Sequence, residues 1–391
     1  MTNLPFVIIP FLGKETMKRN PRLDIYLDKI KNNSENINAL CLKRGIKVVG
    51  ITKGCSAIVE VGRAMIEGGV NILGDSRTEN LKRLKKAKLE AETMLIRLPM
   101  FSEVDRVLDW ADISLNSEIS IINLLSQEAL KKKIVHRIIL MIDMGDLREG
   151  IMPDDTLQMV GEIRKLSGVK VIGIGTSFCC ISGVMPTSEK LTKLVELTEE
   201  IENNFHINLE IISGGNTSVL KLVEDDIIPN RINQLRIGVG ILLGQDDVRL
   251  SNITGTYQDT FILTAEVIEV KEKPSMPRGE IGRDAFGEIP VFRDLGIRKR
   301  AILAIGKQDI YINSLIPLKE GIKILGASSD HLIIDITDFK EELKIGAEVG
   351  FRLNYPALLS ATTSKYVKKY FYKKRRKNNG YKYERKKFSI H

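Results

Sequence analysis

The sequence predicts an α/β chain, a (β/α)8 barrel of the TIM type followed by a C-terminal β-rich domain. Eight short β-branched runs, most of them followed by a segment of helical period, alternate along the first two thirds of the chain. After Gly244 the pattern changes to strands and turns. With 391 residues and 43% hydrophobic content, the chain is large enough for both domains. An open doubly wound sheet is the alternative that the alternation leaves open.

The elements follow in a regular order. A first helix is indicated by apolar residues at 27, 30, 37 and 40, and it ends at Gly45. The barrel strands are expected at residues 48–52, 70–74, 93–98, 112–115, 135–144, 169–176, 209–213 and 235–243. Further strands are expected within 261–273, 300–306, 323–337 and 346–353, before a helical segment that begins at Tyr355. The predicted units are an extension (1–20), the barrel (21–244), the β domain (245–364) and a basic tail (365–391).

The positive charge of the chain is concentrated in the tail. The net charge is +9, but residues 365–391 hold twelve Lys and Arg against one acidic residue, so the body is close to neutral. We expect the tail to be a solvated, partly disordered extension. Contact of its interleaved Tyr and basic residues with RNA or anionic lipid is the alternative, and we do not expect nucleic acid to be the main partner.

The cysteines and the N-terminus indicate the cellular setting. Cys41, Cys55, Cys179 and Cys180 lack the spacing of metal ligands, so neither a zinc site nor a disulfide framework is expected. The apolar run 6–12 is too short to span a bilayer and lacks the features of a secretory signal. We therefore expect a cytoplasmic enzyme with reduced thiols and no membrane partner.

Lys53 is the first candidate for chemistry. It directly follows the apolar strand VVGIT, and side chains at the C-terminal ends of barrel strands point into the mouth of the barrel. A lysine that emerges from a buried strand can condense with an aldehyde, which is how pyridoxal-phosphate (PLP) enzymes hold their cofactor. An ordinary structural lysine is the alternative.

A glycine-rich segment after the seventh strand could bind phosphate. In ISGGNTS, the glycines allow backbone N–H groups to approach an anion, and Ser213, Asn216 and Thr217 supply side-chain donors. The loops after strands seven and eight are the usual phosphate site of such barrels. A tight turn with a helix cap explains the same residues equally well.

Two arginines stand at strand ends. Arg236 lies within the apolar strand RIGVGILLG, where a guanidinium needs an acceptor, and a pyridine nitrogen or a barrel-lining ion pair would both serve. Arg148 lies in IDMGDLREG after the fifth strand, and its fork suits a cofactor oxygen or a substrate carboxylate. An ion pair in a surface loop is the alternative for Arg148.

Taken together, these segments resemble the alanine racemase family from about residue 22 to residue 370. RLDIYLDKIKNN is similar to the opening motif of the family, GITKG to its PLP-lysine motif, and IDMGDLREG, GTSFC, SGGNTS and RIGVGILLG to four further barrel segments. RAILAIGKQD, SSDHLIID and NYPALL are similar to segments of the family's second domain. GEIGRDAFG and GIRKRAILAIG resemble the ornithine racemase branch more closely.

The resemblance implies an isomerase that interconverts L- and D-amino acids with PLP, through a Lys53 aldimine and two bases. It makes Lys53 one base, Arg236 the partner of the pyridine nitrogen and Arg148 a ligand near the phenolate oxygen. The phosphate would be held by Thr217, Gly238, Val239 and Tyr355. A homodimer is implied, because in this family the second domain of one subunit reaches the barrel of the other. The substrate would be a free amino acid, ornithine or another basic one.

The sequence departs from the family at several positions. The family's second catalytic tyrosine is absent, and its region here contains Asp284, so Asp284 and His331 are our candidates for the opposite-face base, with Cys179 third. Ala57 replaces a phosphate-binding tyrosine, and Ser177 replaces a histidine. Three acidic residues near the barrel mouth are expected to meet the distal ammonium of a basic substrate: Asp75, Glu118 and Asp146.

Two other functions stay open at this point. A PLP-binding regulatory protein without turnover would use the same barrel, but its single-domain relatives lack the C-terminal 120 or so residues that this chain has. A metal-assisted lyase on the same barrel would need His and Cys ligands near the C-terminus, where only His331 and His391 occur.

Overall fold

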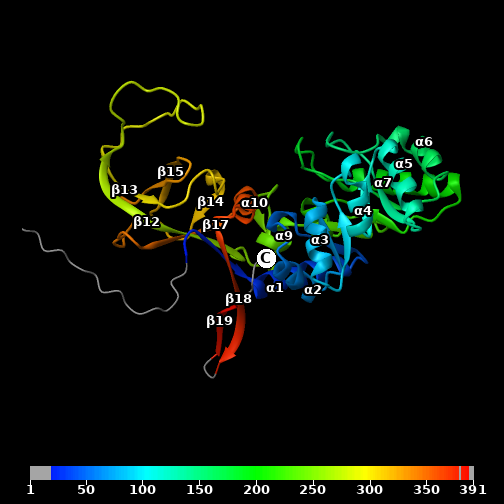
Figure 1. The fold of residues 1–391 in the computed structure, drawn as a ribbon, viewed down its shortest axis with the longest axis horizontal. Coiled ribbons are helices and arrows are strands. Elements are labelled where there is room, and N and C mark those ends of the chain that lie inside the picture. The colour runs from blue at the N-terminus through cyan, green and yellow to red at the C-terminus, as the bar shows by residue number, and fades with distance from the viewer. Residues whose placement is uncertain (1–18, 378–379, 387–391) are drawn as a thin grey trace, which may run out of the picture.

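The chain forms two bodies that lie side by side. The computed structural model describes residues 19–377 and 380–386. The barrel, with its helices, lies on the right of Figure 1, and the antiparallel sheet domain lies on the left. The predicted extension 1–20 falls almost wholly outside the described residues, as do residues 378–379 and 387–391 of the predicted tail.

The barrel is closed, so the predicted fold class is confirmed and the open sheet is excluded. Eight parallel strands follow one another in chain order, and the last pairs with the first through Val49 and Arg236. The strands are β2 (Lys47–Ile51), β3 (Ile72–Asp75), β4 (Glu92–Leu95), β5 (Ile113–Asn116), β6 (His136–Met141), β7 (Val169–Gly175), β8 (Ile211–Ser213) and β9 (Gln234–Ile237). All eight strands lie within or next to the predicted segments.

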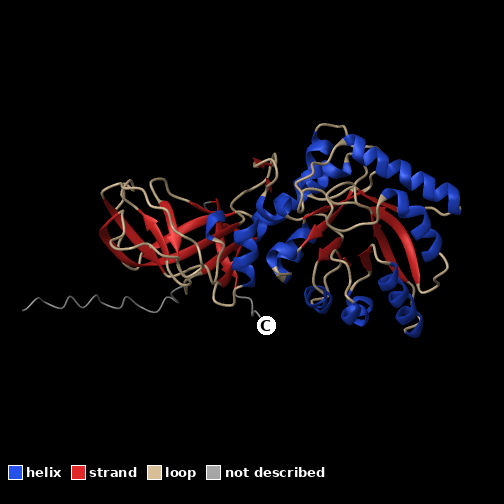
Figure 2. Cartoon of the chain, turned by 90° about the horizontal axis from the view of Figure 1, so that it is seen from above, coloured by secondary structure: helices blue, strands red, loops and turns tan. Residues whose placement is uncertain are grey.

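Helices surround the barrel, as Figure 2 shows. They are α1 (Leu27–Leu42), α2 (Val59–Glu67), α3 (Thr78–Lys86), α4 (Val104–Trp110), α5 (Ile119–Lys131), α6 (Thr156–Ile163), α7 (Ser188–Phe205), α8 (Leu220–Glu224) and α9 (Val239–Leu243). A separate cluster of aliphatic side chains from β2 to β7 packs inside the barrel, including Val49, Met94, Ile139 and Ile172. No helix in the described part of the chain is long and apolar enough to cross a membrane.

The last predicted barrel strand is half strand and half helix. Residues 235–243 were expected to be extended throughout, but the strand stops at Ile237 and α9 begins at Val239. A continuous apolar run that is buried on all sides carries no periodicity, so strand and helix cannot be separated within it. The change at Gly238 turns the start of α9 toward the mouth of the barrel.

The second domain is a mixed sheet with the strand order β15-β16-β13-β12-β1-β18-β19. Its strands are β1 (Arg22–Tyr26), β12 (Phe261–Pro274), β13 (Ile297–Leu303), β14 (Leu315–Pro317), β15 (Lys323–Ala327), β16 (Leu332–Asp335), β17 (Glu348–Leu353), β18 (Lys368–Lys377) and β19 (Gly380–Lys386). β17 pairs with β12 and β14. A small ribbon of β10 (Gln245–Asp246) and β11 (Ser251–Asn252) and helix α10 (Tyr355–Thr363) lie between this sheet and the barrel.

Residues 22–26, which the sequence prediction includes in the opening helix motif, instead form strand β1. β1 pairs with β12 on one side and β18 on the other. Leu23 and Ile25 are fully buried and alternate with polar residues, which is the period of a strand. The signal was present, but five residues directly before a strong helical pattern were read with that helix.

The expectation of a disordered tail is wrong for the part that the structure describes. Residues 368–377 form β18, which runs parallel to β1, and residues 380–386 return as β19. Phe371 and Tyr372 are buried, and the Tyr372 hydroxyl donates to Asp24 at 3.0 Å. The hairpin, red in Figure 1, extends the sheet past the N-terminal strand.

Candidate active site

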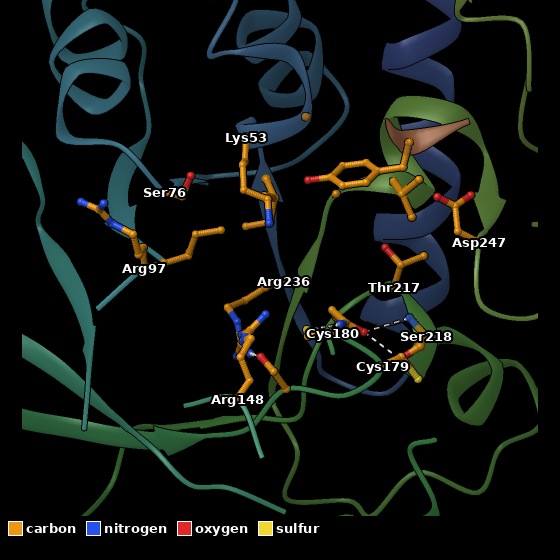
Figure 3. A pocket seen from close by; sticks show the side chains of 18 of the residues that line it. Lys53, Ser76, Arg97, Arg148, Cys179, Cys180, Thr217, Ser218, Arg236 and Asp247 are labelled. Carbon is orange, nitrogen blue, oxygen red and sulfur yellow. Dashed lines mark hydrogen bonds between the residues drawn. The ribbon is translucent and has the colours of Figure 1, made fainter. Parts of the chain in front are cut away.

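A cavity of about 720 Å³ opens where the C-terminal ends of the barrel strands meet the second domain. The loops after β2, β6, β7 and β8, the start of α9 and the first residue of α10 all contribute to it. Figure 3 shows Lys53 entering from one side, with Arg148, Arg236 and Cys180 facing it from the other. The fold therefore brings together side chains as far apart in the sequence as Lys53 and Tyr355.

Lys53 lies where β2 ends. It begins a short 3-10 helix (Lys53–Cys55) and is half-buried, with its Nζ 5.8 Å from the centre of the Tyr355 ring. Before it, the Thr52 hydroxyl donates to the buried Asp75 at 2.7 Å, which ties this strand end to β3. After it, Ser56 has a positive φ of 52°, so the chain turns away sharply and leaves the lysine at the cavity wall.

Arg236 is buried on β9, with 5% of its surface exposed. Its guanidinium donates to Ser213 Oγ, to the Thr176 carbonyl and, at 2.9 Å, to Ser177 Oγ. These acceptors are neutral, and no carboxylate pairs with Arg236 in the described part of the chain. Burial lowers its pKa to about 10. Ser213 does not line the cavity and acts through Arg236.

The glycine-rich loop after β8 forms the wall next to α9. Asn216 Nδ2 donates to the Phe178 carbonyl at 2.7 Å, and Asn216 Oδ1 accepts from the Ser218 amide at 3.1 Å. Gly215 has a φ of +130°, and a Cβ there would lie 3.0 Å from Val219 and 3.3 Å from Phe178, so the turn requires glycine. The Thr217 hydroxyl accepts from the Gly240 amide at 3.3 Å, which joins this loop to the start of α9.

Arg148 follows β6 in an exposed position at the rim of the cavity. Its Nε and one terminal nitrogen donate to the two carboxylate oxygens of Glu149. Partial loss of hydration at the cavity rim lowers the pKa of Arg148, but Glu149 and the nearby Cys180 and Asp146 raise it, and the net change is upward. The buried Asp143 supports the turn by accepting from the Gly145 amide at 2.7 Å.

The predicted site residues fall into two groups. Those from the barrel and α10 line one cavity: Lys53, Arg148, Asn216, Thr217, Arg236, Gly238, Val239 and Tyr355. Asp284 and His331 do not line it, because both lie on exposed loops of the second domain. Asp284 accepts the amides of Phe286 and Glu288 at 2.8 and 3.0 Å, so its carboxylate is used within its own turn.

The prediction that Asp75, Glu118 and Asp146 meet the distal ammonium of a basic substrate is wrong. Asp75 is fully buried and accepts from Thr52, Asn80 and the Arg77 amide. Asp146 is 3% exposed and holds the amides of residues 180 and 181. Glu118 is the exposed residue before α5 and does not line the cavity. The position of these residues near the ends of barrel strands indicated the right region of the fold. It could not show whether each side chain faces the cavity or the core.

The acidic residues that do line the cavity are Glu149, Asp246 and Asp247. Glu149 pairs with Arg148, and Asp246 pairs with Arg249 at 2.7 Å. Asp247 accepts the Tyr355 amide and has no cationic partner in the described residues, and burial together with Asp246 raises its pKa to about 6. Arg97, which follows β4, and Cys180, which lies in the loop after β7, also line the cavity. Neither was among the site residues predicted from the sequence.

Comparisons with known proteins give the relatives of this chain. The family described as "Alanine racemase, N-terminal domain" matches residues 25–246. An ornithine racemase of Acetoanaerobium sticklandii is 41% identical over 350 residues, which cover 89% of this chain and 99% of that protein. A lysine racemase of Thermotoga maritima is 42% identical over 351 residues, covering 90% of this chain and 98% of that protein.

Solved structures agree on the fold. The crystal structure of alanine racemase from D-cycloserine-producing Streptomyces lavendulae superposes with a TM-score of 0.70 at 17% identity, covering 90% of this chain and 98% of that one. A D-threonine aldolase from Filomicrobium marinum superposes with a TM-score of 0.68 at 13% identity, covering 88% and 89%. Since enzymes with different activities share this fold, the chemistry must be argued from the cavity.

Proposed function

This chain belongs to the alanine racemase family and is an amino-acid racemase, and we propose that it interconverts the L- and D-forms of a basic amino acid, ornithine first, with PLP held on Lys53. The observation that carries the proposal is the convergence of Lys53, Arg148, Arg236 and Tyr355 on one cavity. The identity to an ornithine racemase and a lysine racemase over nearly their whole length supports the substrate class.

The cavity fits the cofactor. A buried guanidinium with only neutral partners, as in Arg236, suits an uncharged ring nitrogen, and the polar wall of Thr217, Gly238 and Val239 at the start of α9 suits a phosphate. When bound, PLP supplies an aldehyde for an amine and a conjugated ring that acidifies the α-hydrogen of the attached amino acid.

The side chains then divide the work. Lys53 would hold the cofactor and move a proton at Cα on its own face of the cavity. Arg236, as a donor, would keep the ring nitrogen of the bound cofactor unprotonated, which would weaken the ring as an electron sink. Arg148 would bind the phenolate oxygen or the substrate carboxylate, and Asn216, Thr217 and Tyr355 would hold the phosphate, with Ser213 supporting Arg236 from behind.

The opposite face of Cα needs a second group. Asp284 and His331, our candidates from the sequence, could reach a barrel only from a second copy of the chain, because neither lines the cavity of its own chain. The family implies a homodimer, and we include it in the proposal. The loop that carries Asp284 has several exposed apolar side chains, among them Phe286 at 48% and Val291 at 95%.

A basic substrate needs an anion for its distal ammonium. Of the three acidic residues that line the cavity, only Asp247 lacks a cationic partner in the described residues. A carboxylate that is partly buried without a counter-ion costs free energy that a substrate ammonium would recover. We therefore assign to Asp247 the recognition of the distal ammonium, in place of Asp75, Glu118 and Asp146.

The test is incubation of the purified protein with PLP and a panel of L-amino acids in deuterium oxide. The panel contains ornithine, lysine, arginine, alanine and norvaline, the last being ornithine without its ammonium. α-Deuteration is measured by mass spectrometry and D-isomers by chiral chromatography. We expect deuterated D-ornithine or D-lysine. Exchange only with neutral amino acids would remove the substrate class, and bound PLP without any exchange would favour a regulatory role.

The control is Lys53→Ala. It should lose both the visible absorbance of bound cofactor and the exchange, because Lys53 is the only lysine that lines the cavity in the described residues. Lys193→Ala, on the exposed face of α7, is the matched lysine variant and should keep both. Racemisation that survives in Lys53→Ala would overturn the assignment.

A further inference from the structure

Few groups in the cavity can carry a proton to the face opposite Lys53. The arginines are too basic. Glu149 is held by Arg148, and Asp246 by Arg249. Tyr355 lies next to Lys53, with the centre of its ring 5.8 Å from the Lys53 Nζ, and Asp247 accepts the Tyr355 amide. In Figure 3, Asp247 lies away from Cys180 and the two arginines. Two thiols, Cys179 and Cys180, remain among the described residues that line the cavity.

The two thiols point to different partners. Cys179 has a left-handed φ of 56°, and its Sγ donates to the Val184 carbonyl at 3.2 Å within its own loop. Cys180 Sγ donates to the Phe178 carbonyl at 3.3 Å and lies 3.7 Å from Asn216 Nδ2. The Cys180 thiol is therefore the one next to Asn216, and Arg148 is close enough to influence its pKa. In Figure 3, Cys180 lies on the arginine side of Cys179.

The position of Cys180 is fixed by a buried carboxylate. Its amide donates to both oxygens of Asp146 at 3.2 Å, and the next amide, of Ile181, donates to the same group at 3.3 Å. The Ser182 hydroxyl also donates to the Asp146 carbonyl at 2.6 Å. Asp146 thus builds the turn after β7 that carries the thiol, which explains an acidic residue that does not meet the substrate.

Lys53 and Cys180 approach the cavity from different sides of the barrel. Lys53 follows β2, and Cys180 follows β7, with β8 and β9 between them on one side and β3 to β6 on the other. In Figure 3 the Lys53 amine points down toward the space above Cys180 and the two arginines. A substrate Cα attached near Lys53 would lie between an amine and a thiol.

We propose that Cys180 is the second proton-transfer group, acting on the face of Cα opposite Lys53. This inference rests on the proposed racemase function. In one direction, Lys53 would take the proton as the Cα–H bond breaks, and the cofactor, when bound, would supply the conjugation that accepts the electron pair. The Cys180 S–H bond then breaks, its proton forms the new Cα–H bond on the other face, and a thiolate remains. The reverse direction starts from that thiolate.

The surroundings of Cys180 suit this role. The Cys180 side chain is exposed at the open cavity wall, but the protein around it removes part of its hydration. This is the largest effect on the thiol and raises its pKa, with Asp146 and Glu149 adding to it, so the resting group carries the proton that it must donate. Arg148 and Lys53 act in the other direction and stabilise the thiolate that forms. The guanidinium and the amine therefore limit the rise in pKa without removing the proton.

The test separates the two faces. Cys180→Ala is incubated with PLP and with each ornithine enantiomer in deuterium oxide. We expect racemisation to fall by at least about 100-fold, the usual size of a general acid or base effect. Exchange of the α-hydrogen should survive for the enantiomer that presents it to Lys53, with configuration retained. Racemisation close to the wild-type rate would assign the second face to Asp284 or His331 and overturn the proposal.

Two measurements exclude a structural explanation. Cofactor-free protein is alkylated with iodoacetamide and mapped by mass spectrometry, and added PLP should protect Cys180, since the cofactor would cover it. Ile181→Ala is the matched variant, because Ile181 follows Cys180 in the same turn with a side chain that is 72% exposed and does not line the cavity, and it should keep exchange of both enantiomers. Equal loss of both enantiomers in Cys180→Ala would contradict the inference. Absence of exchange in the wild type would instead refute the racemase proposal itself.

Discussion

His136 is a buried group whose charge state links pH to stability. It opens β6, is 3% exposed, and its Nε2 lies 2.8 Å from the Ser114 hydroxyl. Burial is the main cause of a pKa lowered to about 4, and the neighbouring Arg137 adds to it. In the unfolded chain the pKa returns to about 6.5. The folded protein therefore loses stability as pH falls from about 6.5 toward 4, where only the unfolded state binds the proton.

We predict that this histidine contributes roughly 2–3 kcal/mol to the loss of unfolding free energy between pH 7 and pH 4.5. Urea denaturation of the wild type and His136→Gln at both pH values measures it. The wild type should lose more stability than the variant by that amount. Equal losses in the two proteins would mean that His136 is protonated in the folded state.

Asp247 gives a prediction about substrate recognition. Its pKa is about 6, so the carboxylate is charged above that pH and loses its charge below it, whereas the distal ammonium of ornithine stays charged throughout. KM for ornithine should therefore rise as pH falls from 7 to 5. In Asp247→Asn, KM should be about tenfold higher at pH 7, as expected for one lost ion pair of roughly 1.4 kcal/mol, and should depend less on pH.

Norvaline is the matched substrate for Asp247. It has the same carbon chain as ornithine but no ammonium, so its KM should be nearly equal in the wild type and Asp247→Asn. A variant that impairs both substrates equally would place Asp247 in cofactor binding rather than in specificity.

At the scale of elements, hydrophobic periodicity predicted the strands of the barrel. The places where this prediction is wrong have physical causes. Eight apolar runs were enough to predict eight strands. The boundary between strand and helix at Gly238 was not predicted, because a wholly buried apolar run has no period. Strand β1 was not predicted, because it is short and lies directly before a helix. The prediction for residues 368–377 rested on their positive charge, yet this segment contains the consecutive aromatic residues 370–372, of which Phe371 and Tyr372 are buried where β18 pairs with β1.

The site was predicted to a similar extent, for a similar reason. Lys53, Arg236 and Thr217 follow or end strands that point into the mouth, so their position in the sequence placed them. Cys180 and Asp247 lie in loops whose direction depends on contacts such as the Asp146 carboxylate with the Cys180 amide. The direction of these loops can be known only once the fold is known, because it depends on contacts between residues that are distant in the sequence.

The hairpin at the C-terminus should stabilise the protein unequally along its length. A chain that ends after Ser364 loses the pairing of β18 with β1 and exposes the partners of Phe371 and Tyr372, which should cost at least roughly 3–5 kcal/mol. A chain that ends after Lys374 keeps the register from Arg22–Lys368 to Tyr26–Tyr372 and should lose less stability, because it gives up only the pairing of β18 with β19 and the contact of Tyr383 with Tyr26. Thermal denaturation of both truncations tests this.

The outcome that would contradict this account is equal stability of the two truncations. In that case β18 would not contribute to the sheet in solution. The stability that is lost when β18 is removed also bears on function, because β1, the partner of β18, leads directly into α1, which packs on the barrel next to α2 and α9.

At the scale of the whole molecule, the loop between β12 and β13 exposes apolar side chains, which is typical of a surface that binds another protein surface. Ile289 is 61% exposed and Val291 95%, in a stretch that has few contacts with the rest of its own chain. We expect it to contact a second copy. Ile289→Asp with Val291→Asp should shift the protein from dimer to monomer in sedimentation velocity, while Leu42→Asp, an equally polar change at an exposed site on α1, should not. A wild-type monomer would remove the dimer from the proposal.

If the protein is a dimer, mixing inactive variants shows which residues share a site. Lys53 and Cys180 line one cavity of one chain, so a mixture of Lys53→Ala and Cys180→Ala contains no complete site and should stay inactive after dissociation and reassociation. Lys53→Ala mixed with an inactive Asp284→Asn would behave differently if Asp284 acted across the interface. Random pairing would then form hybrid dimers with one intact site each and restore about a quarter of the wild-type rate. We expect no restoration in the first mixture, because the amine and the thiol are carried by the same barrel. Recovery there would require the two groups to come from different chains and would rule out the arrangement of Lys53 and Cys180 proposed above.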